Sequence, residues 1–131
     1  MLGKEAFAAI DELAQELKQM SRKIWENPEG PYREYIASGT CADFLEKEGF
    51  RVERGCYGLP TAIRAEWGSG HPVIGFLGEY DALPGQSQKD VSHKEPVEEG
   101  AYGHGCGHNV RWKRAVCREH WSSTAALQRK C

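Results

Sequence analysis

A thiol and an imidazole lie two residues apart in the glycine-rich stretch Gly103–Asn109, at Cys106 and His108. Thiolate and neutral imidazole are common ligands of zinc in proteins, and binding at neutral pH releases the thiol proton. The glycines at positions 103, 105 and 107 permit positive φ, so a tight turn can direct both donors to one point. Cys106 and His108 are therefore candidate metal ligands. Two donors alone do not complete a tetrahedral site, and an unligated surface loop is the alternative.

Two carboxylates, Glu79 and Asp81, follow the apolar run 73–77 some twenty-five residues earlier. Side chains two positions apart on a strand point the same way, so the pair can act together. Their candidate roles are metal ligand, general base or orienting carboxylate. The alternative is a solvated strand end that caps a nearby helix. Taken with the Cys-Gly-His motif, the carboxylates indicate a metallohydrolase site.

Two other chemistries are weaker alternatives. Cys106 has a nucleophile's thiol, but a histidine only two residues away rarely has the geometry to deprotonate it. The C-terminal segment places Trp112 and Trp121 among arginines and lysines, which is one signature of nucleic-acid binding. No recognisable nucleic-acid fold accompanies it, and a charge run is more often solvated or disordered. We therefore expect no nucleic-acid partner.

Hydrophobic periodicity predicts the elements that position these residues. Between Glu5 and Glu26, apolar residues recur at helical spacing, and Asn27–Pro28 ends the helix because proline disfavours helical geometry in the residue before it. A second helix is predicted over 33–48, with Gly49 as its C-terminal stop. The period then changes to two, which predicts half-exposed strands around Phe50 and over 62–67.

The continuous apolar run 73–77 predicts a central strand that is covered on both faces. A long loop over 84–109, rich in glycine, proline and charge, leads to the Cys106 motif, and a loop of that length is uncommon unless it serves a site. The predicted fold is α/β, with two N-terminal helices packed on a mixed sheet.

Composition narrows the class of protein. Five cysteines are an odd number at irregular spacing, which indicates reduced thiols rather than a disulfide framework. An acid at Glu5 interrupts the position where a signal peptide would become apolar, and no run approaches the roughly 18 apolar residues that span a bilayer. A cytoplasmic location with no membrane partner is the expectation.

Charge divides the chain unevenly. Residues 1–110 carry 11 basic and 18 acidic side chains, whereas 111–131 carry 6 basic and 1 acidic. This predicts a domain over 1–109 and an atypical basic tail over 110–131 that is poorly ordered. The change near Val110 also motivates the hypothesis that the tail is translated in a shifted frame.

Four motifs in order resemble one enzyme family. They are Ile24–Glu29, Phe44–Phe50, Gly78–Gly85 and Gly103–Asn109. Together they resemble the N-terminal part of the metal-dependent amidohydrolases and metallopeptidases of the carboxypeptidase and aminoacylase type, in the branch of the aminobenzoyl-glutamate hydrolase. The resemblance covers about residues 5–109, which corresponds to the first quarter or so of a typical member.

The resemblance implies a site with two divalent ions, zinc or manganese, that hydrolyses the amide bond of an N-acyl or N-aminobenzoyl amino acid or a small dipeptide. By position, Cys106 and His108 correspond to metal ligands, and Asp81 corresponds to the carboxylate that orients the site. Glu79 stands where other branches have a ligand histidine, so it is a candidate for the shell around the ligands. Full-length relatives are expected to be homo- or hetero-oligomers.

The chain departs from the family pattern after Asn109. Family members continue with an apolar helix and later supply a Glu-Glu pair, further ligands and a dimerisation domain, none of which is present here. The alternative function is therefore a truncated, catalytically incompetent fragment that binds at most one metal ion.

Overall fold

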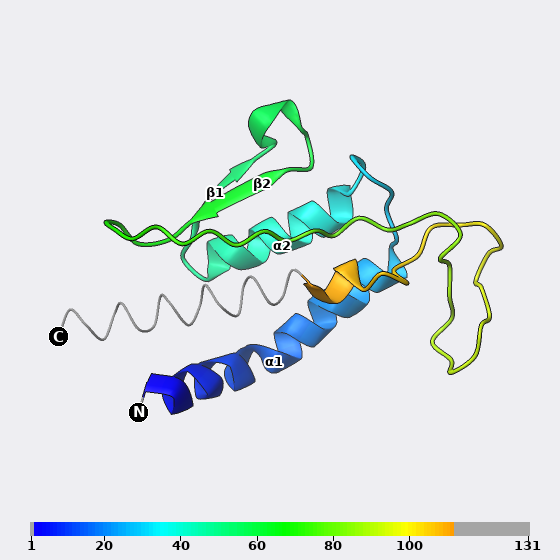
Figure 1. The fold of residues 1–131 in the computed structure, drawn as a ribbon, viewed down its shortest axis with the longest axis horizontal. Coiled ribbons are helices and arrows are strands. Elements are labelled where there is room, and N and C mark those ends of the chain that lie inside the picture. The colour runs from blue at the N-terminus through cyan, green and yellow to red at the C-terminus, as the bar shows by residue number, and fades with distance from the viewer. Residues whose placement is uncertain (1, 112–131) are drawn as a thin grey trace.

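A computed structural model describes residues 2–111 of the 131-residue chain, with residues 2–6 and 9 described by their backbone alone. Its elements are the helices α1 (Leu2–Glu26) and α2 (Tyr35–Lys47), the strands β1 (Arg51–Arg54) and β2 (Ile63–Glu66), and the short 3-10 helix η1 (Cys56–Gly58). Figure 1 shows α2 lying between α1 and the hairpin of β1 and β2. The predicted α/β class and both predicted helices are confirmed.

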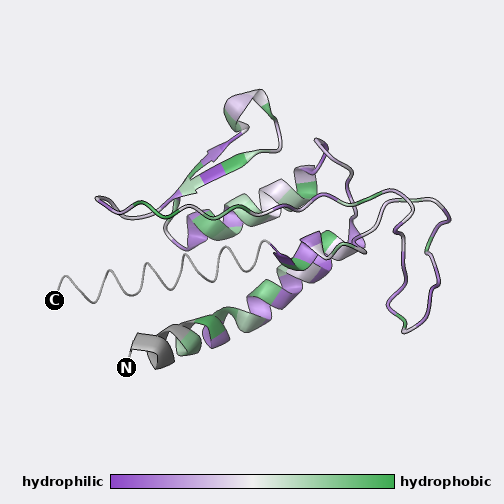
Figure 2. Cartoon of the chain, viewed as in Figure 1, coloured by the Kyte–Doolittle hydropathy of each residue, from purple (hydrophilic) through white to green (hydrophobic). Residues whose placement is uncertain are grey.

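Helix α1 is amphipathic, and Figure 2 shows apolar and polar residues alternating around it. Leu17, Met20 and Ile24 recur at spacings of three and four, so they lie on one face and are buried. The helix ends where predicted. Asn27 donates from its side-chain amide to the carbonyl of Lys23, which satisfies one of the carbonyls left free at a helix end.

Helix α2 is capped at both ends by residues outside it. Glu29 accepts hydrogen bonds from the backbone amides of Ile36 and Ala37, each at 2.9 Å, and so satisfies donors of the first turn. At the other end Gly49 has φ of 87° and donates to Glu46, while Phe50 donates to Leu45. This is the Schellman pattern, in which a glycine in the left-handed region closes the helix.

The sheet is an antiparallel pair in which Arg51 faces Glu66 and Arg54 faces Ile63. It packs on α2 through partly buried apolar side chains, and together with α1 these elements enclose one hydrophobic core. The core residues are Leu17, Met20, Ile24, Ala37, Cys41, Phe44, Leu45 and Phe50.

The prediction of a buried central strand over 73–77 was wrong for this structure. The segment is extended, but its backbone makes no backbone hydrogen bonds within the described part of the chain. Val73, Ile74 and Leu77 are 79%, 65% and 93% exposed. A central strand needs a hydrogen-bonded neighbour on each side, and the two described strands pair with each other. Apolar composition alone does not provide those neighbours.

The predicted long loop over 84–109 is confirmed up to Gly107, and hydrogen bonds join its two sides. Leu83 and Gly103 form an isolated antiparallel bridge, and Gly85 and Ser87 donate to the carbonyls of Gly100 and Ala101. Residues 108–111 then form a helical turn. The predicted tail 110–131 lies outside the described residues except for its first two positions. No helix in the described range has the length and apolarity required to traverse a bilayer.

Candidate functional site

The bridge between Leu83 and Gly103 brings the two sequence motifs together. Each of the two residues donates its amide to the other's carbonyl at 3.0 Å. A Cβ atom at Gly103 would lie 1.9 Å from the carbonyl oxygen of Gln86, so only glycine allows this approach. Asp81 lies two residues before the bridge and His108 five residues after it. The loop therefore returns the histidine to the carboxylates despite their separation in sequence.

His108 is held between the two carboxylates that the sequence analysis singled out. Its Nδ1 lies 2.8 Å from Oδ1 of Asp81 and 3.2 Å from the Asp81 carbonyl oxygen. Its Nε2 lies 3.3 Å from Oε2 of Glu79. The side chains of His108 and Asp81 are 12% and 22% exposed, whereas that of Glu79 is 59% exposed. Asp81 therefore contacts the histidine from the protein side and Glu79 from the solvent side.

The turn that carries His108 is anchored to the helices. Gly107 has φ of 78° and donates to the His104 carbonyl, which reverses the chain immediately before the helical turn begins. Asn109 donates from its side-chain amide to the hydroxyl of Ser21 on α1 at 3.3 Å. On the other side, Ala82 donates its amide to the carbonyl of Glu29 at 2.7 Å. One motif is thus attached to α1 and the other to the segment that joins α1 to α2.

His104 is a candidate site residue that the sequence analysis missed. It is 7% exposed, and neither ring nitrogen has a hydrogen-bond partner within residues 2–111. Burial lowers the pKa of His104 and the charge of His108 lowers it further, while the Ile24 backbone, which acts on the ring without meeting hydrogen-bond geometry, opposes the shift. A buried polar group without a partner requires an explanation. The sequence signal that could have identified His104 is its place in the alternating motif His-Gly-Cys-Gly-His.

Cys106 is a free, partly buried thiol. Within the described range, no three histidine, cysteine, aspartate or glutamate side chains gather in a way that could hold a metal ion. The structure therefore brings His108 into contact with Asp81 and Glu79, but these three side chains do not converge on a point that could hold a metal ion. The predicted ligand roles of Cys106 and His108 and the orienting role of Asp81 remain predictions.

The donor chemistry around His108 nevertheless suits a cation. A metal-binding histidine usually donates its second ring N–H to a carboxylate or carbonyl, which fixes its tautomer and orientation. Asp81 supplies both kinds of acceptor to Nδ1. When Nδ1 carries the proton, the lone pair of Nε2 is available on the side that faces Glu79.

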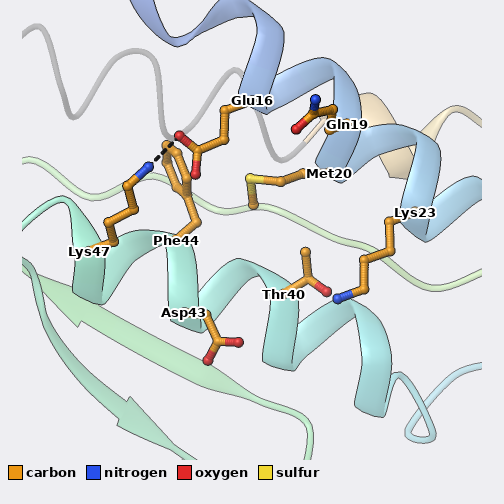
Figure 3. A pocket seen from close by; sticks show the side chains of 8 residues that line it. All are labelled: Glu16, Gln19, Met20, Lys23, Thr40, Asp43, Phe44 and Lys47. Atoms are coloured by element: carbon orange, nitrogen blue, oxygen red, sulfur yellow. Dashed lines mark hydrogen bonds and ion pairs between the residues drawn. The ribbon is translucent and has the colours of Figure 1, made fainter.

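A surface groove between α1 and α2 is separate from this group. Figure 3 shows its lining, in which Lys47 of α2 contacts Glu16 of α1 at 2.5 Å. The lining residues are Glu16, Gln19, Met20, Lys23, Thr40, Asp43, Phe44 and Lys47. They share no member with the residues around His108, so the groove is not part of the candidate site.

Comparisons with known proteins identify similar enzymes. The chain is 41% identical over 103 residues to a subunit of the p-aminobenzoyl-glutamate hydrolase of Escherichia coli, a match that covers 78% of this chain and 21% of that protein. It is 38% identical over 121 residues to the Xaa-Arg dipeptidase of Mus musculus, covering 84% of this chain and 24% of that one. It is 37% identical over 103 residues to thermostable carboxypeptidase 2 of Saccharolobus solfataricus, covering 77% and 25%.

No protein-family model matches the chain. The chain spans between about a fifth and a quarter of the length of these curated relatives. All three are named for the hydrolysis of amide or peptide substrates, and they confirm the resemblance carried by the four motifs. Over most of its length, this chain therefore belongs to the family of amidohydrolases and peptidases that includes these proteins.

Proposed function

We propose that this chain supplies the Asp81 and His108 part of a metal-dependent site that hydrolyses an amide bond in an N-acyl or N-aminobenzoyl amino acid or a small dipeptide. The observation that supports this most is the 2.8 Å contact between Oδ1 of Asp81 and Nδ1 of His108. It gives the histidine the support that metal-binding imidazoles have. The substrate class follows the names of the relatives, which refer to p-aminobenzoyl-glutamate and to Xaa-Arg dipeptides.

In this proposal His108 and Cys106 are ligands of a divalent zinc or manganese ion, one of two in the complete site. When bound, such an ion polarises the scissile carbonyl and lowers the pKa of a coordinated water. Asp81 keeps the proton of His108 on Nδ1 and fixes the ring, which leaves Nε2 as the donor atom. The partly buried position of both side chains restricts water around the histidine and strengthens their interaction.

The relatives also support a proposal about assembly. The Escherichia coli protein is named as a subunit. Within residues 2–111 no group of three donors is arranged to hold a metal ion. We propose that segments beyond the described residues, or a second chain, complete the site.

A second candidate is a non-catalytic chain that binds at most one metal ion. The observation in its favour is that no cluster of three donors forms within residues 2–111. The loss of one general base or acid typically costs about 10²–10⁴-fold in rate, so an incomplete site can bind a metal without measurable turnover. Binding and turnover must therefore be measured separately.

The test measures metal binding and turnover on the same protein preparations. Hydrolysis of p-aminobenzoyl-glutamate and of a dipeptide ending in arginine is assayed with added Zn²⁺ or Mn²⁺, alongside metal affinity by equilibrium dialysis. We expect His108→Ala and Cys106→Ala to abolish turnover and weaken metal binding. The control His93→Ala removes an exposed imidazole that contacts the loop residue Glu95 and should change neither.

The possible results distinguish between the two candidate functions. Turnover that both site variants retain would contradict the proposed ligands. Metal binding that depends on His108 without turnover by the wild-type chain would support the second candidate.

A further inference from the structure

Tyr80 stands between the two carboxylates in the sequence, but its side chain lies on the other side of the chain. Its ring packs against the hydrophobic core, and its hydroxyl donates a hydrogen bond to the carbonyl oxygen of Thr61. Neighbouring side chains of an extended chain point to opposite faces. The tyrosine therefore points inward, while Glu79 and Asp81 contact His108.

The Tyr80 hydroxyl is the end of a series of hydrogen bonds through buried side chains. Thr61 is 4% exposed, and its hydroxyl donates to Oε2 of Glu34 at 2.6 Å. Glu34 is 8% exposed, and its Oε1 accepts from the backbone amide of Tyr32 at 2.9 Å. Because Glu34 is the N-cap residue of α2, the series joins the start of α2, the loop before β2 and the chain beside Asp81.

The backbone gives Asp81 little support on its N-terminal side. Within the described part of the chain, residues 73–81 make no backbone–backbone hydrogen bonds. The next such bond along the chain is donated by Ala82 to the carbonyl of Glu29. Tyr80 and Ala82 therefore hold the aspartate from its two sides, the tyrosine through its side chain and the alanine through its backbone.

The position of Asp81 matters because its contact with His108 is short. Oδ1 lies 2.8 Å from Nδ1, and hydrogen bonds weaken steeply when their angle is distorted. We propose that Tyr80 is a positioning residue whose inward-facing hydroxyl holds Asp81 in contact with His108. Thr61 and Glu34 extend this support to α2. The inference rests on the proposed function and adds positioning residues to it.

A purely structural role of Tyr80 is the alternative. Without its hydroxyl, the carbonyl of buried Thr61 loses a donor, which lowers the stability of the fold whether or not Asp81 moves. The test must therefore observe the folded state itself. The imidazole signals of His108 in nuclear magnetic resonance spectra serve this purpose, because they report its contact with Asp81 and require neither metal nor turnover.

The experiment compares two substitutions in the full chain without added metal. Tyr80→Phe removes the hydroxyl and keeps the ring, and Thr61→Val removes the hydroxyl that reaches Glu34 with little change of shape. Tyr35→Phe is the matched control, because Tyr35 lies on α2 and is 61% exposed. His108→Ala assigns the imidazole signals through their loss, and urea denaturation measures the stability of each variant in parallel.

We expect Tyr80→Phe to displace the His108 signals by more than their linewidths, and Thr61→Val to displace them less in the same direction. The exposed His93 on the loop should keep its wild-type signals, and Tyr35→Phe should leave both histidines unchanged. If Tyr80→Phe lowers stability but leaves the His108 signals in place, the role is structural and the inference is overturned. If Tyr80→Phe does not fold, Thr61→Val decides: displaced signals support the inference, and unchanged signals overturn it.

The inference and the proposed function fail separately. A wild-type chain that binds no Zn²⁺ at millimolar concentration contradicts the proposed function, whereas the His108 signals still test the support of Asp81. Zn²⁺ binding that depends on His108, together with unchanged signals in both variants, overturns the inference alone. Where Zn²⁺ binds, Tyr80→Phe should also lower its affinity by about tenfold, the lower end of the effect known for residues around metal ligands.

Discussion

At the scale of single residues, environment decides what each polar side chain can do. His108 has an acceptor on one ring nitrogen and a carboxylate beside the other, whereas His104, four residues earlier, is buried without hydrogen-bond partners in the described range. The cysteines differ in the same way. Cys106 is a partly buried thiol in the Cys-Gly-His motif, but Cys41 is a core residue that is 2% exposed. Cysteine is thus a candidate metal ligand at position 106 and an apolar core residue at position 41.

Cys41 gives a prediction about stability at alkaline pH. Burial raises the pKa of the Cys41 thiol well above its usual range, so the folded chain keeps it neutral. The unfolded thiol ionises near its ordinary value, and the stabilising contribution is present below that pH and lost as pH rises above it. We expect the free energy of unfolding of wild type to fall more steeply than that of Cys41→Ala between roughly pH 8 and pH 10.

Urea denaturation at several pH values measures this difference. Cys41→Ala also leaves a small cavity, which lowers stability at every pH but does not change the slope. Parallel pH profiles for the two proteins would show that ionisation of Cys41 is not coupled to folding. Cys106→Ala provides the comparison with a thiol outside the core.

At the scale of elements, the helices depend on residues that lie beyond their ends. A side chain at the N-cap usually satisfies the first free amides of a helix. In α2 the N-cap residue is Glu34, whose side chain makes no such bond, and Glu29 takes that role from five residues earlier. Glu29 also accepts from Ala82 through its carbonyl, so the residue that caps α2 also holds the segment next to Asp81.

Removal of this cap should destabilise the fold. Glu29→Ala leaves the amides of Ile36 and Ala37 without their carboxylate acceptor, and the loss of a helix cap costs about 1 kcal/mol. The control Glu12→Ala removes an exposed carboxylate from α1 and should change the free energy of unfolding little. Chemical denaturation monitored by circular dichroism distinguishes the two. Equal stabilities for both variants would mean that water replaces the Glu29 bonds without loss.

At the scale of the whole molecule, the extended segment 73–77 is an apolar surface that the described residues leave uncovered. Val73, Ile74 and Leu77 are exposed, and their backbone makes no backbone hydrogen bonds within that range. Unpaired extended backbone with apolar side chains is a template for pairing with another chain. The isolated chain is therefore expected to self-associate through this segment.

Charged substitutions should suppress that association. Leu77→Lys places a charge on a 93% exposed side chain, so it should lower the amount of aggregate without lowering the melting temperature. Val97→Lys is the control, because it changes an exposed apolar residue on the loop outside the segment. Light scattering after size-exclusion chromatography measures the effect. A wild-type chain that remains monodisperse at high concentration would argue against association through 73–77.

The amino-acid sequence by itself determined the features that depend on neighbours along the chain. The helical spacing of Leu17, Met20 and Ile24 predicted α1 and its buried face, and Gly49 predicted the end of α2, because these signals act within a few residues. The four ordered motifs also indicated the enzyme family, which the relatives confirm. Within the motifs, the sequence assigned Asp81 and His108 to one site by resemblance but did not specify the contact between their side chains.

Tertiary structure decided the features that join distant segments. The bridge between Leu83 and Gly103 brings His108 to Asp81 and Glu79, and no local pattern specifies that return of the loop. Tertiary structure also left 73–77 unpaired, because a strand forms only when hydrogen-bonding neighbours are available beside it. Local spacing sets the helices, while contacts between residues far apart in the chain set the site and the sheet.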